Sequence, residues 1–297
     1  MHTTGETAVA SVPEWASGAH LTGRIPFFIR ARSEGARVRL ETVDELRTLH
    51  TNGQTEGIAM IKSIVITGAS KGIGRAAADA LVNDGWSVIG IARTSPEFFP
   101  GEFIEVDLSD RKQTEEVSSY LVTREHVLGI VNNVGLVRHE TFGAIDPDTF
   151  STVMDLNIRP ALQLTQALLP GMRAAEFGRI INITSLVTRG LAYRASYAAA
   201  KAALESVTRT MAIELASEGI TANAVAPGPT ETELFRANNP HGSEGEARYL
   251  AKVPMRRFAN PADIAGAVAF FASKAAAFIT GQTLFVDGGA SLGTLHS

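Results

Sequence analysis

The sequence predicts a doubly wound α/β fold: one Rossmann-type parallel sheet of about seven strands, flanked by helices and preceded by an N-terminal extension. From Met60 onward, short β-branched apolar runs alternate with amphipathic helical stretches. Strands that are separated by helices run parallel and cross over right-handedly. A glycine-rich turn also follows the first strand and leads directly into a helix, as in sheets that bind dinucleotides.

The composition is that of a globular chain long enough to bury a large core, with 297 residues of which 45% are hydrophobic. The 27 basic and 31 acidic residues give a net charge of -4. We therefore expect no nucleic-acid partner, which would require a basic excess. No apolar run is long enough to cross a membrane, so no membrane partner is expected. Cysteine is absent, which excludes disulfides and Cys-ligated metals, and we expect a cytoplasmic protein without a metal site.

Residues 1–59 differ from the rest in composition and apolar pattern, and we expect them to be an irregular extension. They contain six Arg, no Lys and seven acidic residues, which is too acidic for a mitochondrial transit peptide. Apolar spacing predicts one short helix at Arg37–Leu49. We place the start of the catalytic domain, residues 60–297, at Met60. Composition leaves open whether Met60 is the natural translation start, with the preceding residues a cloning or gene-calling extension.

The strands and helices of residues 60–297 follow from their apolar patterns. Strands are expected at Ser63–Thr67, Ser87–Ala92, Phe103–Val106, Gly129–Asn132, Arg179–Thr184, Thr221–Ala226 and Leu284–Val286. Helices are expected at Arg75–Asn83, Asp148–Ala174, Ser196–Ser217 and Pro261–Ser273. Two helix starts are visible, at Asp146 before Pro147 and at Asn260 before Pro261, because a short polar cap followed by proline suits a first turn.

The turn after the first strand predicts a bound dinucleotide. Its sequence is Thr67-Gly68-Ala69-Ser70-Lys71-Gly72-Ile73-Gly74. Glycines let the backbone approach a pyrophosphate, and the N–H groups at the start of the next helix face its charge. The second strand ends Gly90-Ile91-Ala92-Arg93-Thr94, with no acid before Glu97. Arg93 and Lys71 could clamp a ribose 2′-phosphate, which favours NADP(H) over NAD(H). NAD(H) is the alternative cofactor. In that case Arg93 and Lys71 would be surface cations that contact only solvent.

Tyr197 and Lys201 are the only tyrosine and lysine four residues apart in this order. On a helix this spacing places both side chains on one face. An ammonium beside the phenol favours the phenolate and lowers a pKa that is ordinarily about 10, so the tyrosine can exchange a proton near neutral pH. Ser185 ends an earlier strand, and the turns Asn132-Asn133-Val134-Gly135 and Pro227-Gly228 end two others. All of these strand ends lie at the edge where doubly wound sheets bind ligands.

As a set, these motifs resemble the classical short-chain dehydrogenase/reductase family, over essentially all of Met60–Ser297. The resemblance implies that Tyr197 is the general acid/base, that Ser185 binds the substrate oxygen, and that Lys201 lowers the tyrosine pKa and holds the nicotinamide ribose. It implies that Asn157 anchors a water linked to the lysine. The chain departs from the family at Val134, where alanine is usual, and in its N-terminal extension.

The resemblance also implies the remaining cofactor contacts and the reaction. The contacts are Asp107 and Leu108 along the adenine, Asn133 on the adenosine side, Gly135, Pro227 and Gly228 in the turns, and Thr230 and Thr232 at the carboxamide and pyrophosphate. A reduced nicotinamide would deliver hydride to a carbonyl carbon while Tyr197 protonates the oxygen. The polar stretch Pro229–Ala259 is expected to be a mobile lid over the substrate or a disordered loop.

Motifs near the C-terminus are most similar to those of the 3-oxoacyl-carrier-protein reductases, so the expected substrate is a 3-oxoacyl thioester. These motifs include Val286-Asp287-Gly288-Gly289. Family members are mostly homotetramers, which implies the same assembly here. Two alternatives stay open: an NAD-dependent secondary-alcohol, sugar or steroid dehydrogenase of the same family, and a catalytically silent dinucleotide-binding regulator.

Overall fold

A computed structural model describes residues 27–31, 37–40, 58–59, 62–124 and 126–293 of the chain. The chain divides into two units, Met1–Met60 and Ile61–Ser297. In the first unit, β1 (Phe27–Ala31), β2 (Arg37–Leu40) and β3 (Ile58–Ala59) form an antiparallel sheet in the order β2-β1-β3.

The helix predicted over Arg37–Leu49 is therefore wrong for its first four residues, which form β2. Residues 41–49 lie outside the described part of the chain. Basic and apolar residues alternate in Arg37-Val38-Arg39-Leu40. A two-residue period is typical of a strand. In these four residues it outweighs the helical spacing of the longer stretch Arg37–Leu49.

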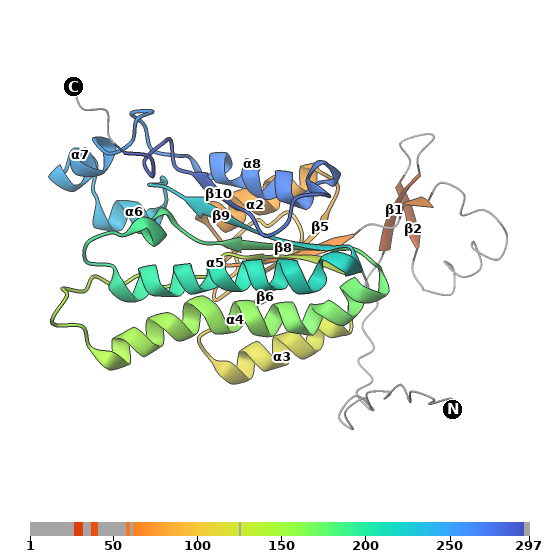
Figure 1. Ribbon diagram of the computed structural model, residues 1–297. Coiled ribbons are helices and arrows are strands. Elements are labelled where there is room, and N and C mark those ends of the chain that lie inside the picture. Colours follow the sequence, from red (N-terminus) through yellow and green to blue (C-terminus); the bar gives the residue numbers. More distant parts are fainter. Residues whose placement is uncertain (1–26, 32–36, 41–57, 60–61, 125, 294–297) are drawn as a thin grey trace, which may run out of the picture. The chain divides into compact units, whose positions relative to one another are not determined.

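The second unit is built on a seven-stranded parallel sheet in the order β10-β9-β8-β7-β4-β5-β6 (Figure 1). Its strands are β4 (Ser63–Thr67), β5 (Ser87–Ala92), β6 (Glu102–Glu105), β7 (Val127–Asn132), β8 (Gly178–Ile183), β9 (Ile220–Pro227) and β10 (Thr283–Val286). All seven lie where the sequence predicts them, with bounds that agree within two residues. The chain winds outward from β4 in one direction and then from β7 in the other, so the ends of β4 and β7 form the switch point at which such sheets bind ligands.

Helices cover both faces of this sheet (Figure 1). They are α2 (Gly72–Asn83), α3 (Arg111–Val122), α4 (Pro147–Ala174), α5 (Ala195–Leu215), α6 (Glu233–Asn238), α7 (Glu244–Leu250) and α8 (Pro261–Ala272). Asp146 caps α4 and accepts a hydrogen bond from Thr149 N at 2.8 Å, as the sequence predicts. Among the described residues, no helix is both long enough and apolar enough to cross a membrane.

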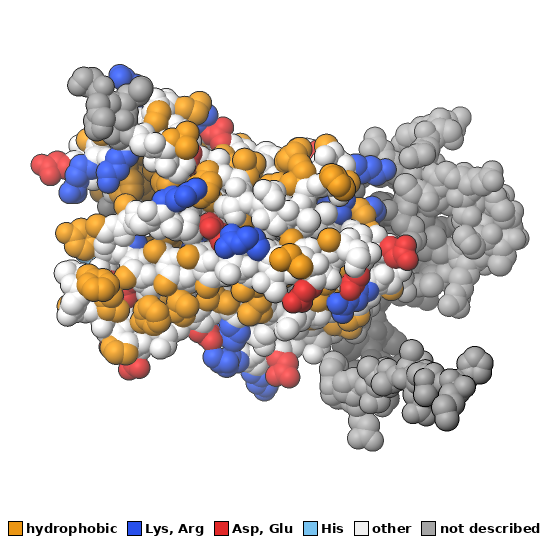
Figure 2. Space-filling model, viewed as in Figure 1, with side chains coloured by type: hydrophobic (Ala, Val, Ile, Leu, Met, Phe, Trp, Pro, Cys, Tyr) orange, Lys and Arg blue, Asp and Glu red, His pale blue; other side chains and the backbone are white. Residues whose placement is uncertain are grey.

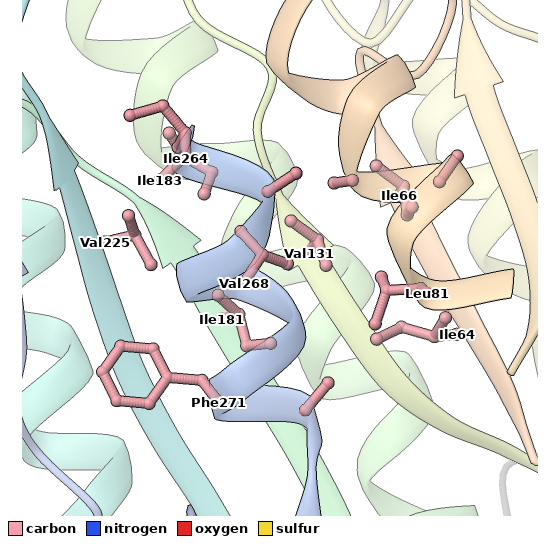
Figure 3. Close-up of a cluster of buried hydrophobic side chains, with 14 of the residues drawn as sticks. Ile64, Ile66, Leu81, Val131, Ile181, Ile183, Val225, Ile264, Val268 and Phe271 are labelled. Atoms are coloured by element: carbon pink, nitrogen blue, oxygen red, sulfur yellow. The ribbon is translucent and has the colours of Figure 1, made fainter. Parts of the chain in front are cut away.

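The two-residue period of the strands divides the hydrophobic core into two layers. Ile64 and Ile66 pack on the side of α2 and α8, whereas Val65 between them packs on the side of α3, α4 and α5. Figure 3 shows the first layer, in which Leu81 of α2 and Phe271 of α8 lie near strand residues. Burial of each such side chain stabilises the fold by about 1.5–3 kcal/mol. β7, β8 and β9 are buried along their whole length, which explains their continuous apolar runs.

The stretch Pro229–Ala259 contains two short helices, α6 and α7, rather than an irregular loop. Its two ends are joined, because Glu231 N donates to Ala259 O at 2.8 Å and Ala259 N donates to Pro229 O at 3.0 Å. Within it, Arg236 forms ion pairs with both Glu231 and Glu246. The stretch therefore begins after the carboxyl end of β9, and hydrogen bonds hold its two ends together.

Candidate active site

The glycine-rich turn between β4 and α2 depends on its glycines. Gly68 and Gly72 have φ values of 65° and 56°, a region that other residues rarely adopt. A Cβ on Gly74 would lie 2.2 Å from the carbonyl oxygen of Gly68. Ile73 packs against the core, whereas Ser70 and Lys71 lie in the turn itself.

The first turn of α2 is suited to hold an anion. Its N-cap residue, Lys71, makes no capping hydrogen bond with its side chain, and the first turn contains no acidic residue. The N–H groups at the start of a helix have no partner within the helix and carry a partial positive charge. Nothing local therefore competes with a pyrophosphate for these groups, and the residues present fit a dinucleotide.

Asn133 links the turn after β7 to the glycine-rich turn. Its backbone N–H donates to Thr67 Oγ1 at 2.9 Å, and its side-chain Nδ2 donates to the carbonyl oxygens of Thr67 and Gly68 at 3.0 and 3.2 Å. Val134 N also donates to Thr67 Oγ1, at 3.0 Å. The amide of Asn133 thus braces the cofactor-binding turn. Thr67 shares this role, and its only signal in the sequence is a hydroxyl at the end of the first strand.

The two cations predicted to hold a 2′-phosphate have different surroundings. Arg93 follows β5 directly and is exposed. Lys71 Nζ lies 2.6 Å from Glu233 Oε2 of α6, and both of these side chains are also exposed. Hydrogen bonds from the backbone and side chain of Ser109 lower the pKa of Asp107, and the charge of Arg93 lowers it further. Arg93 is therefore close enough to Asp107 to act on it, while Lys71 is engaged by the α6 segment.

Tyr197, Ser185 and Lys201 meet at the carboxyl end of β8. Ser185 follows that strand and shares a hydrogen bond with the side chain of Tyr197. Lys201 is almost fully buried, with 2% of its surface exposed, and its Nζ donates to Ile183 O at 2.8 Å. The same Nζ lies 5.7 Å from the centre of the Tyr197 ring. The four-residue spacing on α5 thus places the half-buried phenol of Tyr197 beside the buried ammonium of Lys201.

Burial shifts the pKa of Tyr197 and the pKa of Lys201, in each case so that the uncharged form is favoured. Loss of hydration raises the pKa of Tyr197 to about 12, although the hydrogen bond with Ser185 and the charge of Arg194 act in the opposite direction. The same cause lowers the pKa of Lys201 to about 8. The sequence argument expected the ammonium to lower the tyrosine pKa. Desolvation raises the pKa instead, and the groups that act against it are Ser185 and Arg194 rather than Lys201.

Asn157 of α4 completes the cluster. It is buried, its Nδ2 donates to Leu136 O at 2.9 Å and to Val153 O at 2.8 Å, and its Oδ1 accepts from Leu136 N at 3.3 Å. A Cβ on Gly135 would lie 2.8 Å from Asn157 Oδ1 and 3.4 Å from Lys201 Nζ. The asparagine and the lysine therefore border the same glycine.

The remaining predicted residues form the turn after β9 and the loop after β6. Pro227 ends β9, and a Cβ on Gly228 would lie 2.6 Å from Cα of Asp287. Thr230 Oγ1 donates to Gly228 O at 2.9 Å, whereas Thr232 caps α6 by accepting from Phe235 N at 3.2 Å. Leu108 is buried. Its carbonyl oxygen accepts a hydrogen bond from Arg159 at 2.9 Å.

Comparison with known proteins agrees with this geometry. The family model described as enoyl-(acyl carrier protein) reductase matches residues 68–291. The 3-oxoacyl-[acyl-carrier-protein] reductase of Vibrio harveyi is 39% identical over 241 residues, which cover 77% of this chain and 96% of the relative. The reductase of the same name from Escherichia coli K12 is 37% identical over 238 residues, with the same coverage.

Solved structures of similar fold include proteins that act on sugars. One is a Beutenbergia cavernae protein proposed to be an NAD(P)-dependent gluconate 5-dehydrogenase, solved with NADP at low occupancy. It has a TM-score of 0.73 and 32% identity, covering 77% of this chain and 96% of that one. Another is the aldohexose dehydrogenase of Thermoplasma acidophilum, with a TM-score of 0.73 and 28% identity, covering 80% and 96%.

Proposed function

The chain belongs to the short-chain dehydrogenase/reductase family of oxidoreductases, and on that basis we propose that it reduces a carbonyl group with NADPH. The observation that carries the proposal is the meeting of Ser185, Tyr197 and Lys201 at the end of β8. At the end of β4, two strands away in the sheet, α2 begins without a capping hydrogen bond from the side chain of its N-cap residue. A proton donor and an anion site are what a nicotinamide-dependent reduction requires of its protein.

The cofactor would be held along the carboxyl edge of the sheet. The first turn of α2 would bind the pyrophosphate. Asp107 and Leu108 would border the adenine, and Arg93, joined by Lys71 when it leaves Glu233, would bind a 2′-phosphate. Thr230 and Thr232 would lie at the carboxamide and the pyrophosphate. When bound, NADPH supplies the hydride that the protein itself lacks.

The proton would come from Tyr197. Because burial raises its pKa to about 12, the phenol holds its proton at neutral pH, and that proton is available for the substrate oxygen as the hydride arrives. Ser185, which shares a hydrogen bond with that phenol, would bind and steady the substrate oxygen. Lys201 and Asn157, which both border Gly135, would hold the ribose and a water that resupplies the proton.

The substrate we propose is a 3-oxoacyl thioester, because both reductases compared above act on 3-oxoacyl chains and the chain covers 96% of each. A sugar or sugar-acid substrate is the second candidate, supported by the two solved structures. These candidates differ in polarity and size, so one experiment separates them. Purified protein is offered 3-oxoacyl thioesters, keto-sugar acids and aldohexoses, and turnover is followed as consumption or production of NADPH and NADH.

We expect NADPH-dependent reduction of the 3-oxoacyl thioester, with a kcat/KM at least about tenfold above that with NADH, since a charge-assisted contact to a phosphate is worth about 1.5–3 kcal/mol. Oxidation of aldohexoses with NAD alone would favour the second candidate. Tight NADPH binding without turnover of any compound would instead favour a catalytically silent dinucleotide-binding regulator.

We also propose a homotetramer in which α4 and α5 contribute to a subunit contact. On the face that these helices present, Figure 2 shows hydrophobic side chains between scattered charges. Ile213 of α5 is 83% exposed, and Phe150 of α4 is 37% exposed. Burial of such side chains against a second subunit would stabilise the contact. Size-exclusion chromatography with light scattering measures the mass directly, and a monomer would contradict the proposal.

The catalytic unit is proposed to function without residues 1–59. Every residue assigned to the site lies between Gly68 and Thr232. A chain that begins at Met60 should therefore retain kcat and KM within about twofold, as expected when no catalytic contact is lost. An inactive but folded truncated protein would show that the extension takes part in the reaction.

A further inference from the structure

Glu140, in the loop that joins β7 to α4, is a buried acid that no part of the reaction described above uses. Only 7% of its surface is exposed. Its Oε2 accepts two hydrogen bonds from Ser196, one from the backbone N at 3.0 Å and one from Oγ at 2.5 Å. Its Oε1 is also buried and has no hydrogen-bond partner among the described residues. A half-satisfied buried carboxylate is costly, so stability alone gives no reason for an acid here.

Ser196 is the second residue of α5 and directly precedes Tyr197. The start of α5 has no local cap, because the side chain of the N-cap residue Arg194 makes no capping hydrogen bond and the first turn contains no acid. The first N–H groups of a helix need an acceptor. Glu140 supplies one from a loop 56 residues earlier in the chain. Its carboxylate also has the sign that a helix N-terminus favours.

Two further contacts join the same loops. Glu140 N donates to Tyr193 O at 3.1 Å. The ring of His139 stacks on that of Tyr193, with ring centres 4.7 Å apart and planes 13° apart. Tyr193 has a φ of 62°, which is unusual for a residue with a side chain and persists only where the surroundings impose it. The loop after Gly135 is thus clamped to the bend that leads into α5.

We propose that Glu140 is a positioning residue, whose carboxylate fixes the first turn of α5 and thereby the phenol of Tyr197 relative to Ser185. The inference rests on the proposed function, in which Tyr197 donates the proton. A displacement of about 1 Å at a reacting group can cost about 100-fold in rate. Loss of the clamp should therefore lower kcat while cofactor affinity stays unchanged, because Glu140 contacts none of the cofactor-binding residues described above.

Two conservative variants separate a positioning role from a role for the charge. Glu140→Gln keeps an acceptor oxygen at the same reach and loses the charge, whereas Glu140→Asp keeps the charge and is one methylene shorter. The proposal predicts a kcat within about threefold of wild type for Gln and a loss of about tenfold or more for Asp, with NADPH affinity unchanged in both. An Asp variant at least as active as the Gln variant would overturn it.

A matched control exists in Asp146, which accepts hydrogen bonds from the N and Oγ1 of Thr149 at the start of α4, at 2.8 and 2.7 Å. Asp146→Ala removes the same pair of bonds from a different helix. Glu140→Ala should lower kcat by about 10- to 100-fold and Asp146→Ala by less than about twofold. Amide hydrogen exchange over residues 195–199 should accelerate in Glu140→Ala only. Equal kcat losses, or exchange that stays at the wild-type rate in Glu140→Ala, would overturn the proposal.

Failure of this inference is distinguishable from failure of the proposed function. A wild-type protein that reduces no ketone, or a Tyr197→Phe variant with wild-type kcat, would overturn both. If wild type is active and Tyr197→Phe is inactive, an Asp variant as active as the Gln variant would remove only the role of Glu140.

Discussion

Lys201 donates a hydrogen bond from Nζ to the carbonyl oxygen of Ile183, 2.8 Å away. The bond ties the ammonium of α5 to the end of β8, two residues before Ser185. A single carbonyl compensates little for the removal of an ammonium from water, which is why the pKa of Lys201 falls to about 8. The site therefore holds its lysine at a cost to stability, as functional sites commonly do.

That cost leads to a prediction for stability as a function of pH. The pKa of Lys201 is 10.5 in the unfolded chain and about 8 in the folded one. At about 1.36 kcal/mol per pKa unit, the charged side chain destabilises the fold by about 3 kcal/mol below pH 8. Lys201→Met removes the charge and the hydrogen bond to Ile183, worth about 1 kcal/mol. The variant should thus be more stable than wild type by about 1–3 kcal/mol at pH 7.

The advantage of the Met variant should shrink as the pH rises. Between pH 8 and 10.5 the unfolded chain holds more protons at residue 201 than the folded chain does, so the stability of wild type increases with pH. Tyr197 is present in both proteins, so its own titration cancels from the difference. Urea unfolding at pH 7 and at pH 10 measures the two differences. A Met variant less stable than wild type at pH 7 would contradict the assignment.

A methyl group at residue 135 should disturb the catalytic cluster. The Cβ introduced by Gly135→Ala would lie 2.8 Å from Asn157 Oδ1 and 3.4 Å from Lys201 Nζ, so the asparagine must move and loses its contact with Leu136 N. We expect kcat to fall by about tenfold or more, with a loss of about 1 kcal/mol in the free energy of unfolding.

The matched control is Gly266→Ala. Gly266 lies within α8, and a Cβ at this position would have no neighbouring atom within 4 Å. The substitution should stabilise the helix by about 0.5–1 kcal/mol and leave kcat unchanged. Steady-state kinetics and urea unfolding of Gly135→Ala and Gly266→Ala test this prediction. A wild-type kcat in Gly135→Ala would show that catalysis does not depend on the present position of Asn157.

The choice between NADPH and NADH should depend on Arg93 and Lys71. Arg93→Ala and Lys71→Ala should each weaken NADPH binding by about tenfold or more, the value of a charge-assisted hydrogen bond. NADH binding should not change. Glu233→Gln releases Lys71 from an exposed ion pair worth at most about 1 kcal/mol, so NADPH should bind up to about fivefold more tightly. Fluorescence titrations with both cofactors test this, and equal losses for NADH and NADPH would argue against a phosphate clamp.

The strands of the second unit could be predicted because their apolar, β-branched residues are a local signal. Ser63–Thr67 and Ser87–Ala92 were predicted to the residue. The predicted start of α2 at Arg75 is three residues late, because glycines that are needed for the turn read as helix breakers. β2 was missed because a four-residue strand lies inside a longer stretch with helical spacing.

The site was only partly predictable. Tyr197 and Lys201 share a helix face, so their spacing is a local signal, and their proximity follows from it. The rise of the Tyr197 pKa depends on burial, which no spacing reveals. The contact of Glu140 with Ser196 joins residues 56 positions apart, and the pairing of Lys71 with Glu233 joins residues 162 positions apart. Such pairs are created only when the loops at the end of the sheet come together.

The central claim is that Tyr197 donates the proton in an NADPH-dependent reduction, and Tyr197→Phe tests it most directly. The variant keeps the ring and loses only the hydroxyl. In single-turnover measurements with the best ketone substrate, the rate should fall by about 100- to 10,000-fold, the range for loss of a general acid. NADPH should still bind with a Kd within about twofold of wild type, as measured by fluorescence titration. A rate close to that of wild type would contradict the account.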